Sequence, residues 1–242
     1  MGKCLFMRKG ETHTAPISGI LASDLAVGSV VKLMENGVAT EYLVVNQGKP
    51  SGSSLYDDSC DGAWLLRKDC VNSIIFDYLN DYANSDLKDY LSGQFFPKFD
   101  SIAQSVIKQV KIPYRAGSGY ANTVSSGANG HETNVFLLSA TELNWGSGVN
   151  SCVDGASLEY FSNCAETDDK RISNYNGSAS VYWTRSPYCN SNYENKGIVS
   201  VTNGGGWTAD NCSIQTRGVR PALILPSTAL FDTNTLILKG VA

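Results

Sequence analysis

The pattern of apolar positions after residue 28 predicts short strands before any helix. Two β-rich runs, residues 30–33 and 38–45, flank Glu35-Asn36-Gly37. An Asn-Gly pair between such runs is a strong hairpin signal, because both positions of the tightest hairpin turn require a positive φ. The apolar run at residues 63–66 predicts a further strand that is short and buried.

Apolar residues with helical spacing follow these strands. One set recurs at i, i+3, i+4 and i+7, which predicts an amphipathic helix over residues 75–82. Its members are Ile75, Tyr78, Leu79 and Tyr82. The same spacing predicts a second helix, and there the apolar residues are Leu87, Tyr90 and Leu91.

A third helical segment is expected to begin at Ser101 and to end before Pro113. Gln104 lies three residues after Ser101, which is the spacing of a capping box. The apolar residues expected to form the buried face of this segment are Ile102, Val106, Ile107 and Val110.

The remaining apolar runs are short and are separated by polar stretches. Residues 116–131 are rich in Gly, Ser and Asn and are expected to form a long loop. Ser139 and Glu142 repeat the capping-box spacing and predict a single helical turn. Further strands are predicted at residues 135–138, 181–184, 198–201, 219–225 and 235–238.

Composition indicates a folded, acidic protein. The chain has 242 residues, of which 42% are apolar and 10% aromatic, so disorder is not expected. The net charge is −4, and proteins that bind phosphate backbones are usually basic, so nucleic acid is not an expected partner. No run of about 18 apolar residues is present, so membrane insertion is not expected. We predict one domain at residues 17–242, preceded by a lead-in at residues 1–16.

Residue types that carry metal or catalytic chemistry are scarce or poorly spaced. His13 and His131 are the two histidines, and no nucleophile accompanies His131, so a catalytic role for it is not expected. The seven cysteines contain no Cys-x-x-Cys pair and are expected to be mostly reduced, packed thiols. The acidic loop at residues 57–62 lacks the spacing of a calcium-binding loop. We therefore expect no cofactor, no metal site and no enzymatic activity.

The last third of the chain combines few charges with many aromatic and amide side chains. Residues 172–216 contain four charged residues, seven asparagines, four tyrosines and two tryptophans. Tyr and Trp provide large, rigid contact areas, and Asn and Ser supply hydrogen-bond donors and acceptors, as in antibody-type binding loops. The alternative is a set of turns between antiparallel strands, with the aromatic side chains buried.

Two motifs carry a resemblance that extends over most of residues 20–240. The segments Tyr182-Trp183-Thr184-Arg185-Ser186-Pro187 and Gly218-Val219-Arg220-Pro221-Ala222 resemble a family of uncharacterised bacterial and phage domains with Trp-x-Arg-Ser-Pro and Gly-Val-Arg-Pro-Ala motifs. The layout is also similar to that of the C-type-lectin-like variable proteins of diversity-generating retroelements. This resemblance implies an α+β fold, namely a C-type-lectin-like mixed domain with short antiparallel strands, two or three helices and long loops.

The resemblance implies a scaffold role for Trp183, Arg185 and Arg220, and a ligand-displaying role for loops at about residues 174–217. The calcium-ligand motifs of sugar-binding C-type lectins do not occur in the sequence, so calcium-dependent sugar binding is not expected. Formylglycine-generating enzymes are similar in layout and bind copper through two cysteines. Cys189 and Cys212 lie in the corresponding third of the chain without the surrounding motif. A disulfide between them and two unrelated thiols are the alternatives.

These observations predict a ligand-binding display protein. A phage receptor-binding or tail-associated protein, or a bacterial surface adhesin, would suit, and the resemblance extends this to a variable protein of a diversity-generating retroelement. The expected partner is a protein or glycan ligand on a cell surface, and a homo-oligomer is left open. The first ten residues show no apolar stretch long enough for a secretory signal. The expected location is therefore a virion tail or, by another export route, the bacterial surface.

Two other functions are left open: a formylglycine-type copper oxidase, and a structural virion module in which the aromatic residues are buried. Solvent exposure of the aromatic side chains distinguishes the binding protein from the structural module. The predicted ligand-binding residues are Tyr188, Asn190, Asn192, Tyr193, Asn195, Asn203, Trp207, Asp210, Asn211 and Ser213.

Overall fold

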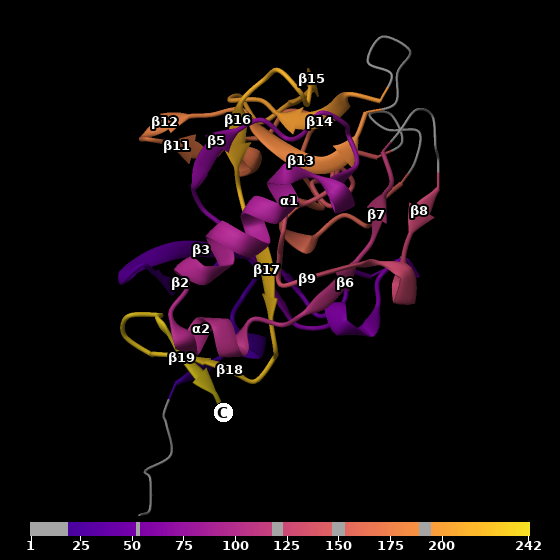
Figure 1. The fold of residues 1–242 in the computed structure, drawn as a ribbon. Helices are drawn as coiled ribbons and strands as arrows, with labels where there is room; N and C mark the ends of the chain where they lie inside the picture. The colour runs from indigo at the N-terminus through magenta and orange to yellow at the C-terminus, as the bar shows by residue number, and fades with distance from the viewer. Residues whose placement is uncertain (1–18, 52–53, 118–122, 147–152, 189–194) are drawn as a thin grey trace, which may run out of the picture.

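Short strands build most of the protein, which we describe from a computed structural model (Figure 1). The structure describes residues 19–51, 54–117, 123–146, 153–188 and 195–242. Within these ranges strands outnumber helices, and most neighbouring strands are antiparallel. The expected mixed α+β fold with short antiparallel strands is confirmed at this level. The predicted lead-in at residues 1–16 lies outside the described residues.

The first five-stranded sheet is antiparallel throughout and contains the predicted hairpin. In spatial order its strands are β10 (Val135–Phe136), β17 (Ala222–Leu225), β4 (Ala63–Arg67), β3 (Val38–Gln47) and β2 (Val30–Glu35). Asn36 and Gly37 form the turn between β2 and β3, with φ values of 48° and 80°. The hairpin and the strand predicted at residues 63–66 are therefore confirmed.

The second five-stranded sheet contains one parallel pair, and its edge strand holds three of the predicted binding residues, Trp207, Asp210 and Asn211. In spatial order its strands are β15 (Trp207–Asn211), β14 (Gly197–Val201), β13 (Tyr182–Pro187), β16 (Arg217–Val219) and β5 (Asn72–Ile74). The parallel pair is β13 and β16. All residues of β13 and β14 are buried, so the centre of this sheet is covered on both faces. The strands predicted at residues 181–184 and 198–201 are confirmed.

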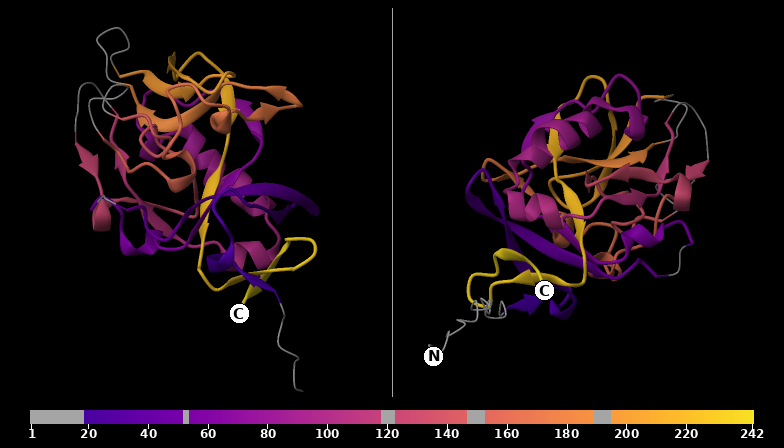
Figure 2. Two further views of the ribbon diagram at one scale, coloured as in Figure 1. Left: turned by 180° about the vertical axis from the view of Figure 1, so that it is seen from behind. Right: turned by 60° about the horizontal axis from the view of Figure 1, so that its bottom comes forward.

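Two chain segments run side by side from one five-stranded sheet to the other, and we call them the connecting ribbon (residues 63–74 and 217–225). β4 continues into β5 and β16 continues into β17, while β4 pairs with β17 and β5 pairs with β16. Figure 2 shows from behind how the C-terminal segment of this ribbon passes through the middle of the protein. The two sheets are therefore joined by paired backbone rather than by a single strand.

The single strand predicted at residues 219–225 is interrupted where the chain passes from one sheet to the other. Arg67 donates its backbone N–H to the Pro221 carbonyl at 2.8 Å, and Val71 donates to the Val219 carbonyl at 2.9 Å. The chain changes sheets at Pro221, which has no N–H for a strand ladder, so the regular strand stops there. This break separates β16 from β17.

The remaining strands form one three-stranded sheet and three pairs. The three-stranded sheet contains β1 (Ile20–Leu21), β18 (Ala229–Phe231) and β19 (Leu238–Val241). The pairs are β6 (Val110–Ile112) with β9 (His131–Thr133), β7 (Tyr114–Arg115) with β8 (Val124–Ser125), and β11 (Asn174–Tyr175) with β12 (Ser178–Ala179). The predicted loop at residues 116–131 thus includes a short strand. The strand predicted at residues 235–238 begins only at its last residue, because Asp232 accepts hydrogen bonds that hold the preceding residues in a turn.

The two described α-helices lie close to predicted positions. α1 (Asp86–Tyr90) continues into a π-helical turn, Leu91–Phe95, and burial of its apolar stripe confirms the second predicted helix. Single 3-10 turns are present at Ala22–Asp24, Asp58–Cys60, Tyr82–Asn84, Phe96–Lys98, Gly127–Asn129, Glu159–Phe161 and Asp169–Arg171. Among the described residues, no helix combines the length and apolarity needed to cross a membrane.

The helix α2 (Ser101–Val106) begins at the predicted residue, but its capping differs from the prediction. Asp100 rather than Ser101 is the N-terminal cap, and its Oδ1 accepts the Ala103 N–H at 2.8 Å. Gln104 donates its side-chain amide to the Phe99 carbonyl instead of closing a capping box. Ile102, predicted to be buried, is 42% exposed, whereas Val106 and Ile107 are buried as predicted. Val110 is also buried, but it lies in β6 and not in the helix, which ends at Val106 and is therefore shorter than predicted.

The helix predicted at residues 75–82 is wrong. The segment is irregular and ends in a 3-10 turn. Its backbone bonds to a distant part of the chain, as the Phe76 N–H does to the Cys212 carbonyl at 3.1 Å. Two members of the supposed apolar face, Tyr78 and Leu79, are 73% and 44% exposed. Long-range backbone pairing therefore decides the conformation here, against the local spacing.

Replacement of Gly62 will test how closely the connecting ribbon is packed. Gly62 has φ 152°, and a Cβ at this position would lie 2.2 Å from the Leu225 carbonyl oxygen. We expect Gly62→Ala to lower the free energy of unfolding by about 3 kcal/mol, because the backbone of β17 has to move. Urea denaturation measures this value. The control is Gly93→Ala, where nothing lies within 4 Å, and a gain of about 0.5 kcal/mol is expected. Equal effects of the two substitutions would contradict the packing described.

Candidate ligand-binding surface

Tyr188 and Trp207 form an aromatic pair at the edge of the second sheet. Tyr188 follows β13, and its N–H donates to the Gly197 carbonyl at 2.8 Å. Trp207 is the first residue of the edge strand β15 and lies opposite Val201. The ring centroids are 5.8 Å apart, with the planes tilted by 40°. Both residues pack against the core and are only partly buried, so each remains partly accessible to solvent.

A tight turn before β15 fixes the position of Trp207. Gly205 has φ 77°, and a Cβ there would lie 2.1 Å from the Asp168 carbonyl oxygen. The Asp168 N–H in turn donates to the Gly205 carbonyl at 3.3 Å. On the same side of the turn, the indole N–H of Trp207 donates to the carboxylate of Glu166, which is exposed, at 3.4 Å. Gly205 therefore allows the chain to turn beside Trp207.

The two predicted polar residues of β15, Asp210 and Asn211, lie on opposite faces of the strand and have different partners. Asn211 lies on the same face of β15 as Trp207, because side chains alternate along a strand. Its Oδ1 accepts hydrogen bonds from the N–H and the hydroxyl of Ser213, at 3.0 and 2.8 Å, and holds the following turn. Asp210 lies on the opposite face, is 6% exposed and accepts two hydrogen bonds from the Arg217 guanidinium. The Asp210 carboxylate is therefore used inside the protein.

The other predicted ligand-binding residues are more peripheral or are not described. Asn203 is exposed in the turn before β15, and Asn195 is half-buried, with its carbonyl accepting the Asn80 N–H at 2.9 Å. The structure thus brings Tyr188 and Trp207 together, with Asn211 on the same face. The predicted residues outside the described ranges are Asn190, Asn192 and Tyr193.

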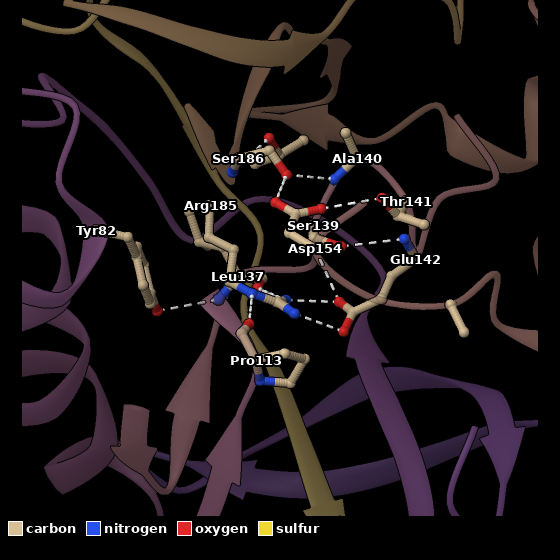
Figure 3. A network of polar contacts seen from close by, with 12 residues as sticks. Tyr82, Pro113, Leu137, Ser139, Ala140, Thr141, Glu142, Asp154, Arg185 and Ser186 are labelled. Atoms are coloured by element: carbon tan, nitrogen blue, oxygen red, sulfur yellow. Dashed lines mark hydrogen bonds and ion pairs between the residues drawn. The ribbon is translucent and has the colours of Figure 1, made fainter. Parts of the chain in front are cut away.

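A buried ion pair beneath this surface holds β13 to a turn that lies far away in the sequence (Figure 3). Arg185 and Glu142 have fully buried side chains, and the two guanidinium–carboxylate hydrogen bonds both measure 2.6 Å. Glu142 also accepts the Tyr56 hydroxyl and the Ser139 N–H, each at 2.9 Å. Arg185 donates further to the carbonyl of Pro113 and to that of residue 137. The pair is therefore well satisfied, which a buried ion pair requires.

Ser186 adds a second polar layer beside this ion pair. Its hydroxyl donates to Asp154 Oδ2 at 2.5 Å and accepts the Ala140 N–H at 2.8 Å. The other oxygen of Asp154 accepts the Thr141 hydroxyl at 3.0 Å. Two successive residues of β13 thus bind the same turn, and the strand that leads to Tyr188 has a fixed position (Figure 3).

The sequence predicts the reciprocal capping box at this turn, but it does not indicate that the Glu142 carboxylate also pairs with Arg185. Glu142 donates its N–H to the Ser139 hydroxyl while accepting the Ser139 N–H, which confirms the predicted single turn. The resemblance implies a scaffold role for Arg185, but local reasoning misses its partner, because Glu142 is 43 positions away. An isolated charge among the uncharged residues of β13 is the one signal that could have indicated a buried partner.

The other buried motif residues also hold the scaffold. Trp183 is 1% exposed and donates its indole N–H to the Ile74 carbonyl at 2.9 Å. Arg220 is 3% exposed and donates to the carbonyls of Arg67 and Arg171. Their contacts join β13 to β5 and fix the connecting ribbon at its crossing point.

Among the described residues, Cys212 is a cysteine near this surface, and its thiol is protonated at neutral pH. Cys212 is fully buried, and burial raises the pKa of its thiol to about 11. Cys189, its expected partner in a disulfide or copper site, lies outside the described residues. In the part of the chain that the structure describes, no group of three or more His, Cys, Asp or Glu side chains converges to hold a metal ion.

The His131 ring lies between two tyrosine rings. The centroids of Tyr82 and Tyr114 are 5.7 and 5.8 Å from its ring. Burial lowers the pKa of His131 from 6.5 to about 4, and the nearby Lys88 and Arg185 add to this effect, whereas Asp81 opposes it. His131 is therefore a neutral ring at pH 7, packed like an aromatic residue.

Replacement of Glu142 will test the buried ion pair. Glu142→Gln keeps the shape but leaves the Arg185 charge without a carboxylate. We expect the free energy of unfolding to fall by about 3–5 kcal/mol, as measured by urea denaturation. The exposed pair of Lys68 and Glu41 is the control, and Glu41→Gln is expected to cost about 0.5 kcal/mol. Similar losses in both variants would contradict the role given to the pair.

The low pKa of His131 predicts a loss of stability in acid. The unfolded chain binds a proton at His131 below pH 6.5, whereas the folded protein does so only near pH 4. This contribution is fully present above pH 6.5 and is lost as the pH falls to 4, because the unfolded state binds more protons. His131→Phe removes the titration and is expected to flatten the stability profile in this window, as measured by urea denaturation at several pH values. Parallel profiles for the two proteins would show that His131 titrates normally.

Comparison with known proteins assigns the chain to a family. Residues 61–227 match the family model described as a domain of unknown function (DUF6273). No curated protein and no solved structure matches the chain. The matched residues include the connecting ribbon, both sequence motifs and the aromatic pair. Because the match covers well over half of the chain, the protein belongs to the DUF6273 family.

Proposed function

We propose that this protein is a binding domain that recognises a protein or glycan on a cell surface through the edge of its second sheet. The observation that carries the proposal is the partly exposed aromatic pair, with the Tyr188 and Trp207 ring centroids 5.8 Å apart. Recognition requires no chemical step, and the contribution of the surface is complementarity of shape and of hydrogen bonding. In a purely structural module both rings would be buried.

The composition and support of the surface favour recognition. Large aromatic side chains contribute most at the centre of interfaces, where they lose few rotamers on binding. Trp207 is preorganised by the turn at Gly205 and by its neighbour Tyr188, so little conformational entropy remains to be lost. The exposed carboxylate of Glu166 and the exposed amide of Asn203 lie at the margin, where polar groups set specificity.

We further propose that the fold is C-type-lectin-like and that the protein acts on a virion tail or on a bacterial surface. The resemblance of the two motifs supports this, and both motif segments are buried scaffold, whereas the chain between them reaches the aromatic pair. In the variable proteins that the layout resembles, this segment is diversified. A near-copy of the codons for residues 174–217, located beside a reverse transcriptase gene and differing mainly at adenines, would test that extension.

The binding proposal is tested with labelled protein on intact bacterial cells of several cell-wall types and on immobilised cell-surface glycans. We expect wild-type protein to bind at least one of these probes, and Trp207→Ala and Tyr188→Ala to weaken that binding by about tenfold or more, since each removes a central aromatic contact. Dissociation constants from surface binding measure the loss, and thermal unfolding shows whether each variant folds.

The matched control is Val38→Ala, which trims an apolar side chain that is 64% exposed at the β2–β3 hairpin in the other large sheet. It is expected to bind as the wild type does. Binding that is unchanged in Trp207→Ala, or wild-type protein that binds none of the cells and glycans, would contradict the proposed function.

A further inference from the structure

A concavity lies beside the first five-stranded sheet. Its volume is about 300 Å³, and its lining includes Gly28 and Val30 at the start of β2, Leu43 of β3, and Tyr160. None of the predicted ligand-binding residues lines it. A cavity of this volume is at the small end of ligand pockets, so it suits a small molecule rather than a macromolecule.

Three cationic side chains line this cavity together with one carboxylate. Lys68, Lys170 and Arg220 are the cations, and Asp169 is the acid. Lys68 is paired with Glu41 at 2.8 Å, but both side chains are about half exposed, so the pair is weakened by solvent. Lys170 donates its ammonium group to the Tyr160 carbonyl at 3.2 Å. The lining therefore carries an excess of positive charge.

Arg220 is the anchored member of this group. It is 3% exposed, and its Nε donates to the Arg67 carbonyl at 2.9 Å. Its Nη1 donates to the Arg171 carbonyl at 3.1 Å and to the Tyr182 hydroxyl at 3.0 Å. These three bonds fix the plane of the guanidinium. The third guanidinium nitrogen, Nη2, makes no hydrogen bond to the described residues. It is not enclosed by protein either, because it is not one of the fully buried side-chain atoms that lack a partner. Since Arg220 lines the cavity, its Nη2 is the guanidinium nitrogen available there.

Other residues that line the cavity are apolar, and we call them the apolar wall. They are Val30, Leu43 and Ile172, and the Tyr160 ring completes the wall, with the Lys170 ammonium 5.1 Å from the ring centroid. Gly28 has φ 94°, and a Cβ at this position would lie 3.7 Å from the Tyr160 ring, so the backbone closely approaches this wall. A ligand that fits has an anionic head for the cations and a small apolar body for the wall.

We propose that this cavity binds a small organic carboxylate. The carboxylate contacts the free Nη2 of Arg220 and the Lys170 ammonium, and its apolar body lies against Val30, Leu43 and Ile172. A monoanion matches the lining better than a phosphate dianion, because one guanidinium nitrogen is free and one lysine is shared with Glu41. Charge-assisted hydrogen bonds from a preformed guanidinium are the stronger kind, and the buried Arg220 is already fixed in place.

The proposal is tested by calorimetry and by NMR titration of the full chain with sodium benzoate, benzyl alcohol, sodium acetate and sodium phosphate. We expect benzoate to bind with a millimolar dissociation constant and to shift the amide resonances of Gly28 and Lys170. Benzyl alcohol, which has the same body without the charge, is expected to bind at least about tenfold more weakly, because it lacks the charge-assisted hydrogen bonds. Acetate, which lacks the apolar body, is also expected to bind more weakly than benzoate.

Two variants separate the charged wall from the apolar wall without altering Arg220, which also holds the fold. Lys170→Met is expected to weaken benzoate binding about fivefold or more, since it removes a charge-assisted contact. Ile172→Ala is expected to weaken benzoate binding while leaving acetate binding unchanged. The control is Lys239→Met, which removes a lysine that is paired with Asp232 outside the cavity and should bind benzoate as the wild type does.

Four outcomes would overturn the proposal. They are the absence of benzoate binding, equal binding of benzoate and benzyl alcohol, tighter binding of phosphate than of benzoate, and unchanged binding in Lys170→Met. Each can occur whether or not the aromatic pair binds a cell surface, so this test and the test of the proposed function fail independently.

Discussion

The ion pair of Arg185 and Glu142 is the interaction on which the rest of the structure depends. Both side chains are fully buried, and a charge without a partner in this place would be strongly destabilising. The pair can exist only when the turn at residues 139–142 and β13 are in register, so it selects one arrangement of the two segments. That arrangement also positions the end of β13, where Tyr188 begins the proposed binding surface.

Another buried arginine, Arg171, also holds together segments that are distant in the sequence. Arg171 donates to the carbonyls of Leu143, Ala165 and Gly205, and it stacks on the Trp145 ring with its guanidinium carbon 4.5 Å from the centroid. Irregular segments leave many carbonyls without a ladder partner, and a guanidinium can satisfy several of them at once. The arginines thus replace the regular secondary structure that the short strands do not provide.

The sequence predicts the features that depend on neighbouring residues. Asn36-Gly37 forms the hairpin, and Ser139 and Glu142 form the capping box, because both signals act over a few positions. The spacing at residues 75–82 fails because the backbone there pairs with segments more than a hundred positions away. The residues of the candidate site likewise fall into those that the sequence indicates and those that only the folded structure reveals. Composition indicates the aromatic pair, whereas the inward-facing Asp210 can be recognised only once β14 and β15 are paired.

The connecting ribbon has a consequence for how the chain is made. Its crossing contact joins Arg67 to Arg220, which are 153 positions apart. During translation, β4 leaves the ribosome long before β17 can cover it, and closing so long a loop carries a large entropic penalty. The edge of β4 that pairs with β17 therefore stays open to misassociation until residues 222–225 have been synthesised. A chain with such a late-closing edge benefits from chaperones that shield nascent polypeptides.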